Sequence, residues 1–337
     1  MPPVTWPDRF GTAFAKTRVL VTGGAGFIGS HLVSALIDLD AEVIVLDDLS
    51  QGRWQNIDSP RQRTGKQLQM VRGSILDLRL LQQLVAGCRW VFHLAALASV
   101  PQSVQQPEHY NQVNTTGTLH VLEAARHAGV ERVMFAASAA IYGDNDQIPK
   151  IETMPPEPMS PYAATKAAGE NLARAYAACY STDTVCLRYF NIFGPRQNPH
   201  SAYAAVIAAF MEALSNAKRP VIYGDGGQSR DFTHVDNAVY ANLLAARQPN
   251  HLGGMALNIA CGHRVTVLEL ATTMAEMAGR SDLIARHEPQ RPADVRHSQA
   301  DLSAAQSAIG YEPILDFRQG LDILLQEHRA SREDTCQ

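Results

Sequence analysis

The chain of 337 residues has no uninterrupted apolar run of about 18 residues, so we expect no membrane-spanning helix. Its five cysteines include no C-x-x-C pair, which argues against zinc sites and disulfide frameworks, and no metal site is predicted. Basic residues are not in excess, since the net charge is −4, so a nucleic-acid or membrane-surface partner is not expected. Residues 1–16 lack the apolar core of a signal peptide. We expect an extension that packs on the surface or frays, in a cytoplasmic protein.

What the chain does have is a glycine-rich stretch near its start. Residues 19–21 form an apolar run typical of a buried parallel strand, and a helical pattern follows Gly29. Between them Gly23, Gly26 and Gly29 are spaced G-x-x-G-x-x-G, which differs from the usual G-x-G-x-x-G fingerprint. Glycines let the backbone approach a pyrophosphate, and a helix N-terminus supplies unpaired N–H groups. The stretch predicts a dinucleotide cradle; the alternative is an ordinary strand–helix turn.

An acidic pair ends the next apolar run, residues 42–46. Asp47 and Asp48 lie roughly 20 residues beyond the glycines, where a carboxylate accepts hydrogen bonds from the adenosine ribose. A carboxylate there repels a 2′-phosphate, so the predicted cofactor is NAD rather than NADP. We assign this contact to Asp47; Asp48 is either a second contact or a polar strand end.

Apolar runs alternate with helical patterns up to about residue 187. This alternation predicts an α/β fold with a Rossmann-like doubly wound parallel sheet. The expected strands are 19–21, 43–46, 68–72, 90–94, 132–136 and 184–187, and the expected helices include 78–86, 110–128 and 161–180. His93, at the end of one strand, is interpreted as a hydrogen-bonded core histidine.

Three polar residues form the candidate catalytic set. Ser138 is the one hydroxyl in a run of small residues after a strand, where ligands of this fold bind. Ser160 followed by Pro161 predicts a helix start, and Tyr162 and Lys166 then share one face of that helix. The Y-x-x-x-K spacing is weak alone, but it follows a dinucleotide pattern here.

The combination resembles the extended short-chain dehydrogenase/reductases, over about residues 17–330. The runs at 187–196, 224–226, 229–232 and 234–236 are similar to nucleotide-sugar 4-epimerases, and closely to bacterial UDP-N-acetylglucosamine 4-epimerases. The resemblance implies an NAD-binding domain at 1–190 and 234–262, with 1–16 as an extension. It implies a smaller, discontinuous C-terminal α/β domain for a UDP-sugar at 191–233 and 263–330. It also implies a homodimer through the helices at 110–128 and 161–180.

The predicted chemistry is reversible oxidation at C4 of the sugar. A lysine ammonium about 4 Å from a phenol contributes on the order of 4 kcal/mol at an effective dielectric of about 20. Beside oxidised NAD, whose nicotinamide cation adds a further positive charge, this is enough to lower a tyrosine pKa of about 10 by about three units. Our hypothesis is that Tyr162 takes the 4-OH proton, Lys166 stabilises the phenolate and Ser138 positions the oxygen. A 4-keto sugar then forms and receives the hydride on its other face, so NAD stays bound.

The remaining site residues are assigned on position and resemblance. The predicted cofactor contacts are Gly23, Gly26, Phe27, Ile28, Gly29, Asp47, Asp48, Ser50, Gly52, Ser74, Ile75, Leu94, Ala95, Ala96, Tyr162, Lys166 and Tyr189. The predicted substrate contacts are Ala98, Ser99, Ser138, Tyr162, Asn191, Gln197, Ala205, Val206, Tyr223, Arg230, Arg291, Asp294 and Ser298. Arg230 and Arg291 are the family's diphosphate arginines, and the planar fork of arginine suits that task.

Small residues decide the expected sugar. Ala139, Ala140 and Ile141 stand where 4,6-dehydratases and decarboxylases of the family carry an acid, so those activities are not expected. Ser298 stands where glucose-restricted epimerases carry a tyrosine, which leaves room for a 2-acetamido group. UDP-GlcNAc and UDP-GalNAc are therefore the preferred substrates. The alternatives are a UDP-glucose 4-epimerase of relaxed specificity, a dehydrogenase that releases NADH, and a non-catalytic NAD sensor.

Overall fold

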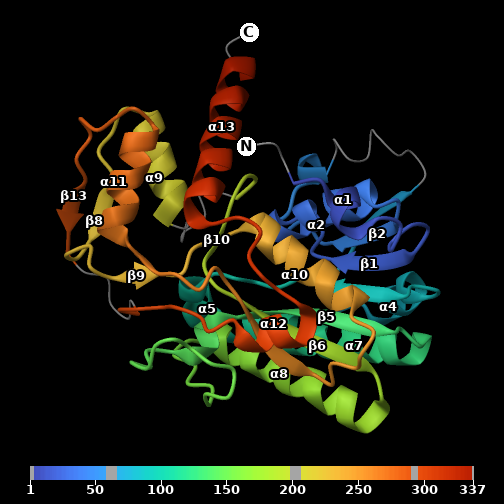
Figure 1. Ribbon diagram of the computed structural model, residues 1–337. Helices are drawn as coiled ribbons and strands as arrows, with labels where there is room; N and C mark the ends of the chain where they lie inside the picture. The colour runs from blue at the N-terminus through green and yellow to red at the C-terminus, as the bar shows by residue number, and fades with distance from the viewer. Residues whose placement is uncertain (1–3, 58–66, 198–205, 290–294, 336–337) are drawn as a thin grey trace.

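Seven parallel strands form the centre of the molecule. The computed structural model describes residues 4–57, 67–197, 206–289 and 295–335 (Figure 1). The sheet has the order β11-β6-β5-β4-β1-β2-β3, and every neighbouring pair is parallel. Its strands are β1 (Arg18–Thr22), β2 (Glu42–Asp47), β3 (Leu68–Arg72), β4 (Trp90–His93), β5 (Arg132–Ser138), β6 (Asp183–Tyr189) and β11 (Met255–Ile259). The predicted fold class is confirmed. The order reverses between β1 and β4, where this architecture binds its ligands.

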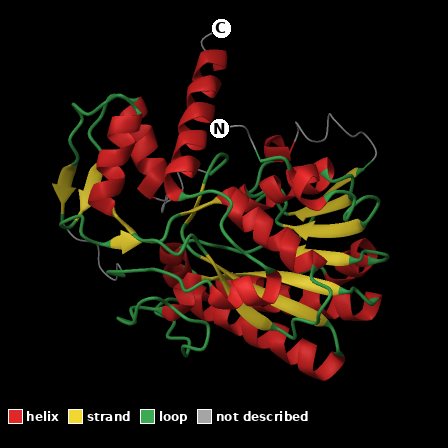
Figure 2. Cartoon of the chain, in the orientation of Figure 1, coloured by secondary structure: helices red, strands yellow, loops and turns green. Residues whose placement is uncertain are grey.

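Helices cover both faces of this sheet (Figure 2). Successive residues of β1 alternate between two apolar cores, with Val19 and Val21 in one and Leu20 in the other. The first core includes residues of α2 (Phe27–Asp38), α10 (Val235–Arg247) and α12 (Ser303–Ile309). The second includes residues of α4 (Leu78–Val85), α7 (Gly117–Ala128) and α8 (Pro161–Tyr180). The sheet is thus fixed from both sides.

The predicted helical stretch at 110–128 is confirmed, but it is not a regular α-helix throughout. The segment is divided into α6 (Pro107–Asn111), a π-helical turn (Gln112–Thr116) and α7. The side chain of Asn114, inside that turn, bonds both the N–H and the carbonyl of Leu97, at 2.8 and 3.0 Å. It also donates to Oγ1 of Thr165, at 3.0 Å. A π-turn accommodates such tertiary contacts at the cost of regular helix bonds.

The N-terminal extension is docked into the core rather than lying on the surface. A short helix, α1 (Trp6–Phe10), places Trp6 and Phe10 at 6% and 5% exposure. Phe14 is fully buried, with its ring centre 5.1 Å from that of Trp90. The prediction of a surface-packed or fraying segment is therefore wrong for residues 4–16, because these aromatic side chains fill the sheet's first core.

A smaller group of elements lies to one side of the sheet, and we call it the cap. It contains α9 (Val206–Ser215), β8 (Val221–Tyr223), β9 (Ser229–Arg230), β12 (Val265–Thr266), α11 (Val267–Met277), β13 (Arg286–Glu288) and α13 (Phe317–Thr335). Its strands form two-stranded sheets, β8 with β13 and β9 with β12. A third such sheet joins β7 (Ile192–Phe193) to β10 (Thr233–His234). In Figure 1 the cap helices α9 and α11 stand apart from the main sheet.

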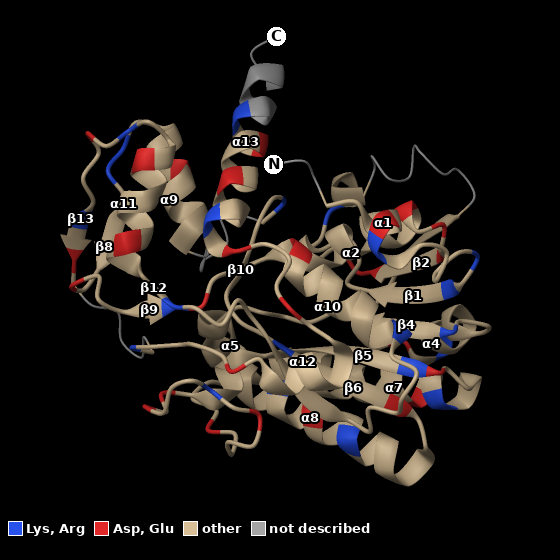
Figure 3. Ribbon diagram, in the orientation of Figure 1, with Lys and Arg blue, Asp and Glu red and all other residues tan. Residues whose placement is uncertain are grey.

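Two surface features bear on partners. Basic and acidic residues are interspersed along the chain in Figure 3, in keeping with the net charge of −4. Among the described residues, no helix is both long enough and apolar enough to span a bilayer.

Candidate active site

The glycine loop between β1 and α2 forms a cradle with no room for side chains. Gly23 has φ +70°, and a Cβ added there would lie 2.6 Å from the backbone nitrogen of Ala95. A Cβ on Gly29 would lie 2.1 Å from the carbonyl oxygen of Gly23. Gly26 is the N-cap of α2 and provides no side-chain cap, so the first N–H groups of the helix are left for a ligand. This geometry fits a pyrophosphate at the helix N-terminus.

Asp47 fastens this loop to the end of β2. Its Oδ2 accepts from the N–H of Ala25 and its Oδ1 from the N–H of Leu49, both at 2.9 Å. Burial raises the pKa of Asp47, while these two N–H groups oppose the shift. Asp48 is exposed, and its Oδ1 accepts from the backbone and hydroxyl of Ser50, at 2.8 and 2.6 Å. The ribose contact of Asp47 stays a prediction; a carboxylate with two lone pairs in use still has others for hydroxyl donors.

The end of β4 is held by a buried polar chain. His93 is 1% exposed, with Nδ1 2.8 Å from Oγ1 of Thr22 and Nε2 3.0 Å from Oγ1 of Thr118. Burial, with the nearby Lys166 charge, lowers the pKa of His93 to about 3. Both ring nitrogens are engaged, so His93 is a hydrogen-bonded core histidine. It fixes the backbone that leads into Leu94, Ala95 and Ala96.

The rest of the predicted cofactor set lies around the carboxyl ends of β1–β4. Phe27 and Ile28 occupy the first turn of α2. Oγ of Ser74 accepts from the N–H of Leu76 at 3.2 Å, and the buried Ile75 packs against α7. A Cβ on Gly52 would lie 2.9 Å from Oδ1 of Asp47. These residues therefore lie near the ends of neighbouring strands, and their cofactor contacts stay predictions.

The candidate catalytic set assembles from β5 and α8. Ser160 is the N-cap of α8, and its side chain accepts from the N–H of Ala163 at 3.2 Å. Ser138 is the last residue of β5 and lies close enough to Tyr162 for its hydroxyl to favour a lower pKa of the tyrosine. Nζ of Lys166, a residue only 4% exposed, donates to the carbonyl oxygen of Ala136 at 2.7 Å. The helix start and strand end thus bring the three residues to one place, as predicted.

The protein groups around Tyr162 do not acidify it by themselves. Nζ of Lys166 lies 6.0 Å from the centre of the Tyr162 ring, and burial lowers the pKa of this lysine to about 8. Burial also raises the pKa of Tyr162, and the hydrogen bond from Ser138 offsets only part of that shift. The predicted acidification is therefore not a property of the chain alone, because desolvation of the phenolate outweighs the nearby charges.

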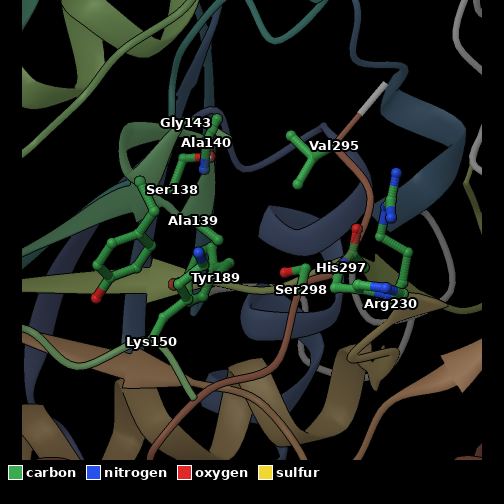
Figure 4. A pocket seen from close by; sticks show the side chains of 12 residues that line it. Ser138, Ala139, Ala140, Gly143, Lys150, Tyr189, Arg230, Val295, His297 and Ser298 are labelled. Carbon is green, nitrogen blue, oxygen red and sulfur yellow. The ribbon is translucent and has the colours of Figure 1, made fainter. Parts of the chain in front are cut away.

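A cavity of about 200 Å³ opens beside Ser138 (Figure 4). Its lining includes five predicted residues: Ser138, Tyr189, Asn191, Arg230 and Ser298. It also includes Ala139, Ala140, Tyr142, Gly143, Lys150, Val295 and His297. Figure 4 shows Ser138 and Ala139 across the cavity from Ser298, which lies next to Arg230. The sheet and the cap thus contribute opposite walls.

Other predicted substrate residues lie outside this lining. Ser99 is the N-cap of α5 (Val100–Gln105) and follows the exposed Ala98. Nε2 of Gln197 donates to the carbonyl of Ile192 at 3.1 Å. Tyr162 lies in the first turn of α8, while Val206 begins α9 and Tyr223 ends β8. Ala205, Arg291 and Asp294 fall outside the described residues.

Sequence reasoning missed three residues that shape this region. Lys150 and His297 line the cavity, and Asn114 links the Leu97 backbone to α8 through Thr165. Asn114 gives no local signal because its role depends on partners distant in sequence. His297 stands next to the predicted Ser298, but nothing in the sequence indicated the contact of the histidine itself.

Known proteins are similar to this chain in sequence and architecture. The family model described as "NAD dependent epimerase/dehydratase family" matches residues 19–260. The chain belongs to this family. A UDP-glucose 4-epimerase of Mycolicibacterium smegmatis is 38% identical over 306 residues, covering 90% of this chain and 96% of that protein. The predictions of a nucleotide-sugar 4-epimerase, an isomerase, and of NAD as its cofactor are confirmed.

Two solved structures show the same architecture with different substrates in their names. A UDP-N-acetylglucosamine 4-epimerase from Methanobrevibacter ruminantium, in complex with UDP-N-acetylmuramic acid, has a TM-score of 0.89 and 39% identity. The match covers 94% of this chain and 99% of that one. The UDP-glucose 4-epimerase of Thermus thermophilus, in complex with NAD, has a TM-score of 0.82 and 35% identity, with 94% and 100% coverage. The relatives are thus divided between the two sugars.

Proposed function

We propose that this protein interconverts UDP-hexoses at C4, with UDP-GlcNAc and UDP-GalNAc as preferred substrates. The observation that carries the proposal is the shared cavity of Ser138 and Ser298. One residue comes from the candidate catalytic set, and the other is the predicted determinant of sugar size. UDP-glucose and UDP-galactose are then weaker substrates, because a roomy pocket rejects a smaller sugar only weakly.

Three residues of the chain would carry the proton chemistry. Tyr162 accepts the proton of the sugar 4-OH, and the neighbouring Ser138 holds the same oxygen. Lys166, anchored on the Ala136 carbonyl, keeps a cationic amine under the phenol. When bound, oxidised NAD supplies the reversible hydride acceptor and a positive charge beside the phenol. Gly23, Gly29 and the N-terminus of α2 would hold its pyrophosphate.

The cap would hold the nucleotide. Arg230 of β9 lines the cavity, and its Nη1 donates to the carbonyl of Ser229 at 2.9 Å, which orients the guanidinium. We assign it to the diphosphate because arginine presents several N–H donors in one plane. The proposed division into an NAD domain (1–190, 234–262) and a UDP-sugar domain (191–233, 263–330) follows the same reasoning. The homodimer and the cytoplasmic location stay predictions.

The preference for acetamido sugars depends on steric room at Ser298. Ala139 and Ala140 face the cavity from the opposite wall and add no bulk. A serine in place of a tyrosine removes an aromatic ring from this space, which accommodates an N-acetyl group. Rejection of a bulkier substrate by contact is the simplest form of selectivity.

Ser298→Tyr tests the preference. We expect the variant to lose UDP-GlcNAc and UDP-GalNAc activity by at least about tenfold in kcat/KM while keeping UDP-Glc and UDP-Gal activity. Both sugar pairs are measured by chromatographic separation of the C4 epimers. Ser303→Tyr, on the exposed start of α12, is the matched control. Equal losses on both pairs would contradict the assignment, and a wild type faster on UDP-Glc would favour the relaxed UDP-glucose epimerase instead.

A further inference from the structure

His297 stands at the cap wall of the cavity in a rigid backbone frame. It is flanked by two backbone bonds to β9: the N–H of Ser229 donates to the carbonyl of Arg296, and the N–H of Ser298 to the carbonyl of Ser229, both at 3.0 Å. The imidazole Nδ1 lies 2.8 Å from Oγ of Ser229, a residue only 2% exposed. The ring is therefore held by one nitrogen. Within the described part of the chain, its Nε2 has no hydrogen-bond partner.

The ring lies in a basic environment. The positive charges of Arg230, Arg264 and Arg296 each lower the pKa of His297. Among the described residues, Asp146 is the one carboxylate whose charge raises it. Arg296 turns outward, where its guanidinium pairs with Asp225 at 2.8 and 2.9 Å. Burial and the three arginines lower the pKa of His297, which favours its neutral form. A neutral imidazole has one N–H and one acceptor nitrogen.

A neutral ring in this place binds an anion only in one tautomer. If the Ser229 hydroxyl donates to Nδ1, the proton resides on Nε2, which then donates to a ligand in the cavity. The surrounding arginines favour a negatively charged ligand. In Figure 4 His297 lies beside Arg230, so one anionic group can bond to both side chains.

We propose that His297 is a binding residue for the diphosphate of the nucleotide substrate, with Ser229 fixing the tautomer that donates from Nε2. This assignment rests on the proposed function, since a UDP-sugar is the anion that the cavity would take. It adds a neutral donor to the cationic one of Arg230. A purely structural Ser229–His297 bond would affect folding and leave nucleotide affinity unchanged.

The test compares UDP with uridine by isothermal titration of the full-length protein. A hydrogen bond to a charged group predicts about 10- to 100-fold weaker UDP binding in His297→Ala, with uridine binding unchanged. His297→Gln places an amide N–H near the position of Nε2 and restores most of the affinity, whereas His297→Asn does not. His287→Ala, on the exposed β13 of the cap, is the matched control and binds UDP like the wild type.

Coupling to Ser229 gives a second readout. Ser229→Ala weakens UDP binding less than His297→Ala does, and the double variant is no weaker than His297→Ala, since both changes remove one interaction. UDP affinity equal in His297→Ala and His287→Ala overturns the proposal, as does an equal loss for uridine. If His297→Ala does not fold, the Gln and Asn variants decide by the same comparison. A wild type that binds UDP but epimerises no UDP-sugar contradicts the proposed function and leaves this test intact.

Discussion

The sheet and the cap are built differently, and the difference assigns them different tasks. Around the sheet, polar groups are locked by several partners: His93 is bonded through both nitrogens, and Asn114 makes three bonds. In the cap the strands are two or three residues long. Arg230, which lines the cavity, lies on one of these short strands, β9, paired with β12. Rigid support suits proton transfer, which tolerates little misplacement. Short connections suit changes of substrate, because they can vary without disturbing the sheet.

The strongest test of this contrast is Tyr162→Phe. Loss of a general base predicts a fall in kcat of about 10²- to 10⁴-fold, while NAD remains bound because the glycine cradle is intact. Turnover of UDP-GlcNAc and the NAD content of the purified protein are both measured. Tyr180→Phe, an exposed tyrosine of the same helix at 53% exposure, is the control and keeps the wild-type rate. A Tyr162→Phe enzyme at the wild-type rate contradicts the base assignment.

Phe14→Ala tests whether the N-terminal extension belongs to the sheet's core. Removal of a fully buried phenylalanine predicts a loss of about 3–5 kcal/mol in the free energy of unfolding. Urea unfolding followed by circular dichroism measures this change. Val104→Ala, at 63% exposure, should change the stability by less than about 0.5 kcal/mol. Similar small changes in both variants would mean that the extension is dispensable.

His93→Gln isolates one buried group of the sheet by its pH dependence. The folded-state pKa of His93 is about 3, below the unfolded value of about 6.5. The unfolded chain therefore binds the proton first, and stability present above pH 6.5 falls as the pH decreases toward 3. We expect wild-type stability to fall about 1 kcal/mol more per pH unit than that of the variant between pH 6 and 4. Parallel slopes in urea unfolding would show that His93 is protonated in the folded protein.

The smallest effect is expected in the cap, at the exposed Arg296–Asp225 ion pair. Asp225 and Arg296 are 64% and 48% exposed, so Asp225→Asn should cost less than about 1 kcal/mol in stability. The difference should shrink further in 1 M NaCl, because salt screens exposed charges. A loss above about 2 kcal/mol at low salt would contradict this prediction, because it would show that the exposed pair contributes strongly to the stability of the cap.

Sequence reasoning predicted the parts of the fold that carry a local signal. Six of the seven sheet strands were predicted, whereas β11 was not among the expected strands. The helix α8 begins at Pro161 and ends at Tyr180 as predicted, because Ser160 and Pro161 mark its start. The π-turn was not visible, since it depends on contacts of Asn114 with residues distant in the chain. Two-residue strands such as β9 and β12 are too short to show a period.

The site was predicted unevenly for the same reason. Ser138, Tyr162 and Lys166 follow from strand-end and helix-face rules, and the structure brings them together. The opposing effect of burial on the pKa of Tyr162 could not be read from a spacing, and its acidification beside NAD stays a prediction. The burial of Trp6, Phe10 and Phe14 was not predicted, because no periodic apolar pattern accompanies these residues. Contacts such as His297 with Ser229 require the folded cap.

The central claim is that hydride leaves and returns to the same sugar while the cofactor stays in place. The most direct measurement follows absorbance at 340 nm in the NAD-loaded protein during conversion of UDP-GlcNAc, with the C4 epimer quantified in the same sample. We predict that UDP-GalNAc accumulates to equilibrium over many turnovers with no growing signal at 340 nm. Absorbance that rises in step with sugar consumption would contradict the account and identify a net dehydrogenase.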